Sequence, residues 1–416
     1  MTLAYENLSR PKQRAKVLLR TRNLKMARNA HAYVRGSTIK FYEWLESGGG
    51  KLPAGPSVWI CGDCHLGNLG PLANADGHVD VQIRDLDQTV IGNPVHDLVR
   101  LGLSLASAAR GSDLPGVTTA RMLEEMVDGY ERAMAGRFDR QTEKNFRPKV
   151  MQAIFERSIR RTWKQLAEER IEDEKPTIPL GKRFWALTNK ERKDLEKLFR
   201  GDDARALITS LKGRRDGDRI EVLDAAYWMK GCSSLGRLRY AVLVGVGDDG
   251  HGPDDLCLID IKEGVQAAAP RAKDAEMPRD NAERVVAGAR ALSPNLGERM
   301  IATRLFDKSV TLRELMPQDL KIEIDPAQPG GGDSGREIPG RRRRASACAP
   351  DGLGHAPKLE GGVGPQPIED ARRTVLALDE RGRAHGVARG RLPRSLPPLR
   401  LERGLILRAG FGRLRW

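Results

Sequence analysis

Hydrophobic positions in the first half of the chain recur at the spacing of α-helices. Near the start, apolar side chains cluster at residues 24–27 and 41–45, and three glycines at 48–50 end the segment. Residues 94–200 continue the helical pattern in long amphipathic stretches. Together these segments predict a mainly helical first domain, residues 1–210.

Two short stretches between the helical segments have the pattern of β-strands. Residues 57–61 form a brief apolar run, and residues 79–83 alternate apolar with polar side chains. Residues 74–77, Asn-Ala-Asp-Gly, form a strong turn signal just before the second stretch. We therefore expect two strands and a polar loop within the first domain.

The pattern changes near Gly213, where apolar runs of β type replace the helical spacing. A Gly- and Asp-rich turn separates the first two runs, and a helical segment around 280–292 precedes the last two. The four strand-like runs are residues 240–246, 256–262, 300–306 and 310–316. This order predicts an antiparallel β domain with one helix over residues 211–325.

The stretch from Pro329 to Trp416 differs in composition from the rest of the chain. It holds 16 Gly, nine Pro and two aromatic residues, and its 17 Arg and one Lys against nine Asp or Glu give a net charge of +9. Such a composition buries too little apolar surface to offset chain entropy, so we expect residues 326–416 to form a disordered tail. Arginine in place of lysine beside Gly, Ala and Pro is also what a GC-rich coding region gives in a shifted reading frame.

Composition and charge restrict the class of protein. No apolar stretch approaches the ~20 residues of a membrane span, and no signal-peptide run follows the basic N-terminus, so we expect a cytoplasmic protein. The five cysteines are too few and too scattered for a disulfide framework. The chain carries +15 in total, but residues 1–328 carry only +6, so the basic excess lies mainly in the tail.

The sharpest local signal is the loop Gly62-Asp63-Cys-His65-Leu-Gly-Asn68, followed after a hairpin by Asp85. Phosphoryl transfer from a nucleotide needs a carboxylate that accepts the proton of the alcohol, and oxygen ligands that hold Mg²⁺ on the phosphates. Asp63 supplies the first, and Asn68 and Asp85 supply the second, while His65 is placed to brace the loop. Asp, Asn and Gly are also common in ordinary surface loops.

A second candidate segment lies in the β domain. Residues 231–236, Gly-Cys-Ser-Ser-Leu-Gly, precede a strand, and Lys262 ends the next strand. A Gly/Ser turn lets backbone N–H groups approach phosphates, and a lysine on a strand reaches their oxygens. Glu283, in the predicted helix, is a candidate partner of Lys262. An ordinary hairpin and a solvated helix face explain the same features.

Together these residues resemble the loops of aminoglycoside-phosphotransferase-type kinases, with the order of the two lobes inverted. The combination resembles the bacterial family DUF2252. Its hallmarks here are Lys25-Met26, Tyr33-Val-Arg35-Gly36, Trp59 to Asn68, Asp85-Leu-Asp87 and Lys262-Glu263. The resemblance covers about residues 10–325. It implies an α+β, protein-kinase-like two-lobe fold that is circularly permuted, followed by the disordered or aberrant C-terminal tail.

The resemblance also implies an activity, a phosphotransferase that uses ATP and Mg²⁺ to phosphorylate an unidentified hydroxyl on a small molecule or protein. Asp63 would then be the catalytic base, and Asn68 and Asp85 the metal ligands. Lys262 would bind the α- and β-phosphates and Glu283 would hold Lys262.

Further roles follow from the same resemblance. Ser233, Ser234 and Gly236 would belong to the glycine-rich loop over the phosphates. The run 313–317, which includes Glu314, would be the hinge whose backbone groups meet the adenine. Asp97 matches the buried aspartate that fixes the catalytic loop, although a helix N-cap explains it equally well. Arg35 is a candidate substrate or phosphate contact, or an ordinary surface arginine.

Three alternatives remain open at the level of sequence. Cys61 and Cys64 have the spacing of a redox or zinc motif, but no second Cys or His pair lies at ligand spacing. Clustered arginines in the tail favour nonspecific nucleic-acid binding, without aromatic residues for base stacking. A non-catalytic nucleotide-binding protein would carry many of the same residues as the kinase.

Overall fold

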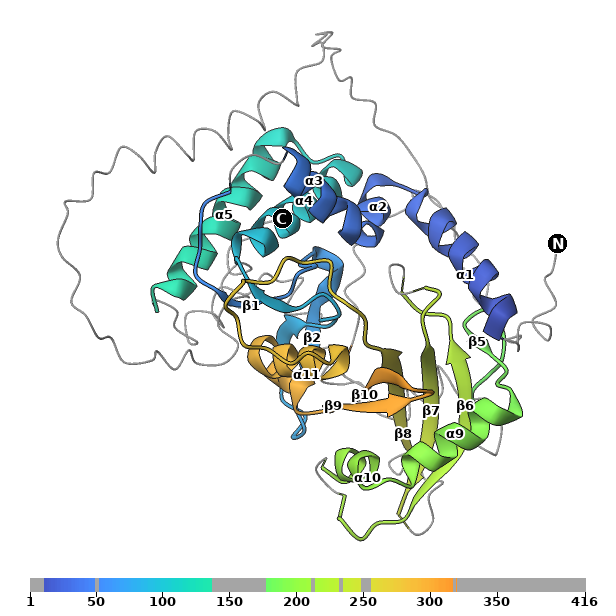
Figure 1. The fold of residues 1–416 in the computed structure, drawn as a ribbon. Coiled ribbons are helices and arrows are strands. Elements are labelled where there is room, and N and C mark those ends of the chain that lie inside the picture. Colours follow the sequence, from blue (N-terminus) through green and yellow to red (C-terminus); the bar gives the residue numbers. More distant parts are fainter. Residues whose placement is uncertain are drawn as a thin grey trace, which may run out of the picture. The chain divides into compact units, whose positions relative to one another are not determined.

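An antiparallel sheet of six strands is the largest β-structure in the described part of the chain (Figure 1). Its strands follow the order β5, β6, β7, β8, β10, β9. The strands are β5 (Phe184–Trp185), β6 (Ile220–Trp228), β7 (Arg239–Val246), β8 (Leu256–Glu263), β9 (Met300–Leu305) and β10 (Lys308–Leu315). The four strands expected from the sequence are confirmed as β7, β8, β9 and β10, and α11 (Asn281–Leu292) is the expected helix.

The computed structural model describes residues 11–48, 52–136, 177–210, 214–231, 235–247, 256–316 and 319. All of them belong to one compact unit of the chain. They confirm the α+β class, with antiparallel pairing throughout the described sheets. The expectations for the tail at 326–416 lie outside the described residues.

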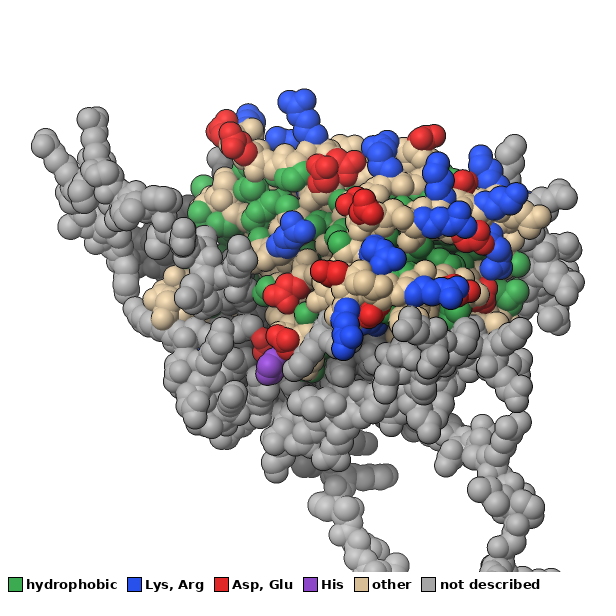
Figure 2. Space-filling view, turned by 90° about the horizontal axis from the view of Figure 1, so that it is seen from below, with side chains coloured by type: hydrophobic (Ala, Val, Ile, Leu, Met, Phe, Trp, Pro, Cys, Tyr) green, Lys and Arg blue, Asp and Glu red, His purple; other side chains and the backbone are tan. Residues whose placement is uncertain are grey.

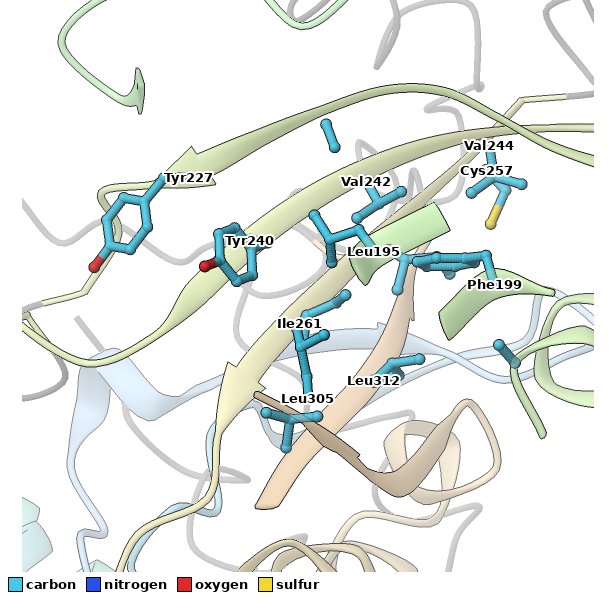
Figure 3. Close-up of a cluster of buried hydrophobic side chains, with 14 of the residues drawn as sticks. Leu195, Phe199, Tyr227, Tyr240, Val242, Val244, Cys257, Ile261, Leu305 and Leu312 are labelled. Atoms are coloured by element: carbon cyan, nitrogen blue, oxygen red, sulfur yellow. The ribbon is translucent and has the colours of Figure 1, made fainter. Parts of the chain in front are cut away.

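One face of the six-stranded sheet is apolar. Side chains alternate along a strand, so Cys257, Ile259 and Ile261 of β8 all point to this face. Three helices contribute to the same core: α1 (Pro11–Met26), α9 (Asn189–Phe199) and α10 (Asp202–Thr209). Figure 3 shows Leu195 and Phe199 of α9 against the side chains of these strands.

The opposite face of the sheet changes from apolar to charged along the strands. Leu258 of β8 packs in an apolar cluster with Leu243 and Leu315 from the neighbouring strands. Asp260 and Lys262 follow on the same face of β8, because they are two and four residues further along. The charged end of this face therefore lies where β8 ends.

A second group of elements carries the loop at 62–68. Two small antiparallel sheets flank it: strands β1 and β4 form one, and strands β2 and β3 form the other. Helices α4, α5 and α11 share an apolar core with the sheet of β2 and β3. The bounds are β1 (Val58–Ile60), β2 (Leu69–Ala73), β3 (Val79–Ile83), β4 (Val90–Gly92), α4 (Val95–Gly111), α5 (Gly116–Met134) and α12 (Pro294–Gly297). Helices α2 (Ala30–Gly36) and α3 (Thr38–Gly48) follow α1, which confirms the helical expectation for the N-terminal segment.

The structure contains strands that the sequence pattern did not predict. Phe184 and Trp185 form an edge strand within a stretch expected to be helical, because they pair with Trp228 and Tyr227. Strand β6 was not expected, since a register shift between Val222 and Asp224 interrupts its alternation. The helical expectation for residues 137–176 lies outside the described residues.

None of the helices in the described ranges is both long enough and apolar enough to cross a membrane.

Candidate functional site

The loop after β1 is fixed by Asp97, in the first turn of α4. The two carboxylate oxygens accept the backbone N–H groups of Cys61, at 2.6 Å, and of Gly62, at 2.9 Å. Asp97 therefore holds the loop rather than capping its own helix. Burial raises the pKa of Asp97 to about 7, against the opposing effect of the two N–H donors. Gly62 has a φ of +73°, and a side chain there would overlap the backbone of Gln88.

Asp63 is oriented by a fully buried arginine. The Nε and Nη2 atoms of Arg100 lie 2.9 Å and 2.8 Å from Oδ1 of Asp63, and Nη2 also donates to the carbonyl of Val34. His65 lies nearby, with its Nε2 3.9 Å from Oδ2 of Asp63. Burial, with the charges of Arg35 and Arg100, lowers the pKa of His65 to about 4, although Asp63 opposes the shift. At neutral pH His65 is therefore uncharged.

Asn68 joins the two polar loops of the site. Its Nδ2 donates to the backbone carbonyl of Asp85 at 2.7 Å and, more weakly, to that of Asp63 at 3.4 Å. Its backbone N–H closes a tight turn on the carbonyl of His65. The loop after β1 and the loop after β3 therefore lie side by side.

Lys262, at the end of β8, meets the second of these loops. Its Nζ lies 3.0 Å and 2.9 Å from the two carboxylate oxygens of Asp85, 177 residues earlier in the chain. The same Nζ lies 2.5 Å from Oδ2 of Asp87. One buried ammonium group therefore contacts two carboxylates, and the structure brings together the loop and the lysine that the sequence singled out.

The two carboxylates respond differently to this environment. Although burial opposes it, the Lys262 charge holds the pKa of Asp85 well below its usual range. Burial and the neighbouring Asp85 carboxylate raise the pKa of Asp87 to about 6, against the effect of Lys262. Asp85 also keeps half of its side chain exposed, whereas Asp87 keeps 17%.

Beside Lys262, three charged residues form a network on the same face of the sheet. Arg239 binds both oxygens of Asp260, at 2.9 Å and 2.6 Å, and Arg313 binds one of them at 3.1 Å. The strand register brings the three side chains together. Arg313 lies opposite Asp260, and Arg239 lies opposite Lys262, two residues further along the same face of β8. Against the cost of burial, the two guanidinium groups hold the pKa of Asp260 well below its usual range.

The glycine-rich segment is only partly described. Ser233 and Ser234 lie outside the described residues. Gly236 has a φ of +100°, which favours glycine, and Lys25 of α1 donates to the carbonyl of Gly231 at 3.0 Å. Backbone pairing of Leu238 with Glu263 places the end of this segment beside the end of β8.

Two residues expected at the site lie elsewhere. Glu283 is exposed in the first turn of α11, and no described residue forms an ion pair with it. Its neighbour Arg284 instead points to the loop and donates to the backbone carbonyls of Asp87 and Thr89. The helix therefore contacts the site through the buried Arg284. Glu283 is exposed and does not pair with Lys262.

Glu314 also lies outside the group of residues around Lys262. Its buried carboxylate pairs with Arg214 on the apolar face of the sheet, at 2.9 Å. Its backbone N–H donates to the carbonyl of Arg299, and its carbonyl accepts from Arg299 Nη1 at 2.6 Å. The backbone N–H, the backbone carbonyl and the carboxylate of Glu314 are therefore all engaged within the fold, and the hinge role expected for it stays a prediction. Pro317, the last residue of the expected hinge, lies outside the described residues.

Cys61 and Cys64 are buried under the loop as free thiols. A hydrogen bond with Cys64 and burial together raise the pKa of Cys61 well above its usual range, so it stays protonated. Across the described residues, no group of three or more His, Cys, Asp and Glu side chains is arranged to hold a metal ion.

The sequence did not single out several residues that build the site. Asp87 belongs to the motif Asp85-Leu-Asp87, but the sequence analysis assigned it no role. Its spacing from Asp85 puts both side chains on one side of an extended segment. Arg100 follows Asp97 at i+3 on α4, a spacing that puts both on one helix face. Arg239, Asp260 and Arg313 carried no such local signal, since strand register alone unites them.

Comparison with known proteins gives one match. Residues 14–333 match the model of the family described as "Uncharacterized protein conserved in bacteria (DUF2252)". Searches of curated proteins and of solved structures found no match. The matched residues span more than half of the chain and include the loop after β1, the Asp85 loop and the Lys262 strand, so the chain belongs to the DUF2252 family.

Proposed function

We propose that the protein is a kinase-like phosphotransferase that binds ATP with Mg²⁺ and transfers phosphate to a hydroxyl acceptor. The observation that carries this proposal is the position of Lys262, whose ammonium lies between the carboxylates of Asp85 and Asp87. A lysine and two carboxylates in contact, beside a loop with Asp63 and Asn68, are the parts that phosphoryl transfer requires.

The oxygen ligands at this site suit a Mg²⁺ ion that is bound jointly by the protein and the nucleotide, rather than by the protein alone. Mg²⁺ prefers oxygen ligands, and in nucleotide sites one or two carboxylates bind it together with the phosphates. Asp85 and Asp87 supply such carboxylates, and the Lys262 ammonium stands in for the cation that two adjacent carboxylates need. Mg²⁺ would neutralise charge on the phosphates, while Asn68 keeps the Asp85 loop in place.

Asp63 is suited to accept the proton of the acceptor hydroxyl. Arg100 binds its Oδ1, and no described residue donates a hydrogen bond to Oδ2. A carboxylate with one oxygen anchored and the other available is oriented for general-base catalysis. The buried His65 and the Asp97 contacts keep this loop in one conformation.

The order of the elements supports a permuted arrangement of two lobes. The loop with Asp63 precedes the lysine strand in the sequence, whereas the resemblance to kinases places the lysine strand first. In the proposed fold, the six-stranded sheet acts as the nucleotide-binding lobe. The loops after β1 and β3, with α4 and α5, act as the catalytic lobe.

One observation favours a second candidate, a nucleotide-binding protein without catalysis. The Arg100 guanidinium occupies Oδ1 of Asp63 through two contacts, which leaves one carboxylate oxygen for an acceptor hydroxyl. Binding through Lys262, Asp85 and Asp87 does not need Asp63. The two candidates therefore differ in what replacement of Asp63 does to turnover.

The charge distribution gives nucleic-acid binding less support than nucleotide binding. On the face shown in Figure 2, Lys and Arg side chains are interspersed with Asp and Glu. An extended patch of one sign is the usual footprint for a polyphosphate backbone. The contacts around Lys262 instead suit a single phosphate group with its metal.

Thermal unfolding with nucleotides tests the proposal. We expect ATP with Mg²⁺ to raise the Tm of the full chain, and ATP with EDTA to do so less. Lys262→Met should reduce the shift, whereas Lys308→Met, which removes an exposed lysine paired with Glu263, should not. Absence of a shift with any nucleoside triphosphate, with or without Mg²⁺, would contradict both candidates.

Turnover separates the two candidates. ADP release from ATP and Mg²⁺ should fall by about 10²-fold or more in Asp63→Asn, while the nucleotide-induced Tm shift persists. Equal rates in the wild type and Asp63→Asn, together with a preserved Tm shift, would identify a non-catalytic nucleotide-binding protein.

A further inference from the structure

Building on the proposed phosphotransferase, we propose that Arg35 binds an anionic group of the acceptor, so the acceptor is a hydroxyl compound that carries a carboxylate or a phosphate. Arg35 lies in the last turn of α2 and is half-buried. The inference concerns the acceptor side of the site, away from Lys262 and the carboxylates that it contacts.

Arg35 packs directly against the loop with Asp63. A Cβ built at Gly67 would lie 2.9 Å from Nε of Arg35 and 3.0 Å from its Cζ. A methyl group at this point of the loop would therefore push the guanidinium out of its position. Gly67 lies within the tight turn that Asn68 closes on His65, so Arg35 is held beside the turn that presents Asp63.

The positive charge of Arg35 is uncompensated in the described part of the chain. Asp63 pairs with Arg100, and Asp85 and Asp87 pair with Lys262. No hydrogen bond or ion pair of the Arg35 guanidinium occurs with any residue in the described ranges. A half-buried guanidinium without a counter-charge keeps its N–H donors available to an anion.

Two buried polar atoms around the same loop also lack partners. Nδ1 of His65 and Nη1 of Arg100 make no hydrogen bond within the described structure, although both residues are more than nine-tenths buried. Buried polar groups normally have a partner, and unpaired ones in a loop are a sign of a polar ligand or water. They belong to side chains that approach Asp63 through their other nitrogens, His65 through Nε2 and Arg100 through Nε and Nη2.

The chemistry of arginine sets the class of the ligand. The planar guanidinium presents paired N–H donors that match the oxygens of a carboxylate or a phosphate. With Asp63 in the loop and Arg35 packed beside Gly67 of the same loop, an acceptor can place its hydroxyl at the first and its anionic group at the second. A neutral alcohol would leave Arg35 unpaired and would bind more weakly.

The first experiment measures anion binding without nucleotide. Inorganic phosphate is titrated into the full chain at constant ionic strength, and the half-saturating concentration is read from the rise in Tm. We expect that concentration to increase roughly tenfold in Arg35→Ala, the loss expected for a charge-assisted contact. Arg28→Ala, which removes an exposed arginine seven residues earlier, should match the wild type.

Two more variants locate the response. Lys262→Met should keep the phosphate response, because the proposed site does not include Lys262. Gly67→Ala should weaken it, since the methyl group displaces the guanidinium. Gly67→Ala also serves if Arg35→Ala does not fold. A wild type without any phosphate response, or a response lost in Lys262→Met and kept in Arg35→Ala, would overturn the inference.

The second experiment compares glycerol with glycerol 3-phosphate as acceptors in the presence of ATP and Mg²⁺. ADP release should be stimulated more by glycerol 3-phosphate, and Arg35→Ala should remove that preference. Nucleotide-induced Tm shifts with no dependence of phosphate binding on Arg35 would leave the proposed function standing and refute the inference. Phosphate binding that depends on Arg35 without any nucleotide response would refute the function instead.

Discussion

Asp85, Asp87 and Asp97 lie within thirteen positions of one another, yet their carboxyl groups differ in acidity. Asp85 faces Lys262 and solvent, so its pKa lies below the usual range. Asp87 shares the same ammonium with less solvent, and burial with the Asp85 charge raises its pKa to about 6. Asp97 has only backbone N–H groups as donors, and burial raises its pKa to about 7. Surroundings, rather than residue type, decide each acidity.

The raised pKa of Asp97 predicts a pH-dependent stability. Its folded pKa lies above its unfolded value, so between pH ~4 and ~7 the folded chain holds a proton that the unfolded chain has lost. This contribution is complete at the acidic end and decreases as the pH rises through that range. In urea unfolding, we expect the wild type to lose at least ~1 kcal/mol more than Asp97→Asn between pH 5 and pH 8.

The comparison between the two proteins isolates Asp97. Asp87 has the same sign of shift and is present in both, so its effect cancels in the difference. Where Asp97 is ionised, Asp97→Asn also removes an acceptor, because an amide cannot accept both N–H groups of the loop as the carboxylate does. Parallel pH profiles for the two proteins would contradict the assignment.

At the scale of elements, α11 anchors the loop that carries Asp87. Arg284 donates to the carbonyls of Asp87, Thr89 and Val265, which lie on two separate segments. Gly288, one turn further along, lets the helix approach the buried side chain of Thr89. The hydroxyl of Thr89 in turn donates to the carbonyl of Ile60 at 2.6 Å. Through Thr89, the close packing of α11 thus stabilises the position of Ile60, just before the loop at 62–68.

This contact predicts opposite effects for two glycine substitutions in helices. Gly288→Ala should lower the free energy of unfolding by about 1–3 kcal/mol, because its methyl group would overlap Thr89. Gly111→Ala, at the end of α4, meets no atom within 4 Å and should be neutral or stabilising by up to ~1 kcal/mol. Chemical denaturation of both variants measures the difference, and equal effects would show that α11 does not depend on this approach.

Across the whole described unit, Asp319 joins parts of the chain that are far apart in sequence. Its carboxylate accepts from Arg299, at distances between 3.1 Å and 3.2 Å, and from the backbone N–H of Ala73 in β2. Arg299 is completely buried and also bonds the carbonyl of Glu314 in β10. One ion pair therefore connects the small hairpin of β2 and β3 to the six-stranded sheet.

Removal of this carboxylate should be costly for the whole unit. Asp319→Ala leaves the buried Arg299 without a counter-charge, and we expect the free energy of unfolding to fall by about 3–5 kcal/mol. Glu298→Ala, beside Arg299 but exposed, should change it by no more than ~0.5 kcal/mol. Thermal or urea unfolding of both variants is the measurement. A small effect of Asp319→Ala would mean that the hairpin and the sheet hold together without this pair.

Regular elements were predictable where one period ran unbroken. Strands β7 and β8 and helix α11 have such patterns, and their bounds agree with the expectations within a residue or two. Strand β6 was missed because the irregularity near Asp224 breaks the alternation, and β2 because Gly70 and Pro71 are poor strand formers. Local patterns report local geometry and lose their meaning where tertiary pairing overrides propensity.

By itself, the sequence determined the strands and helices whose side-chain period is unbroken, and the loops that bring Asp, Asn and Gly together, because these depend on side-chain periods and turn chemistry over a few residues. Only the tertiary structure decided that Lys262 meets Asp85 and Asp87 rather than Glu283. A charged side chain pairs with the opposite charge that packing brings within reach, and packing here joins residues that are 177 positions apart. That choice depends on the register of β8 and the path of the loop after β3, neither of which a local pattern encodes.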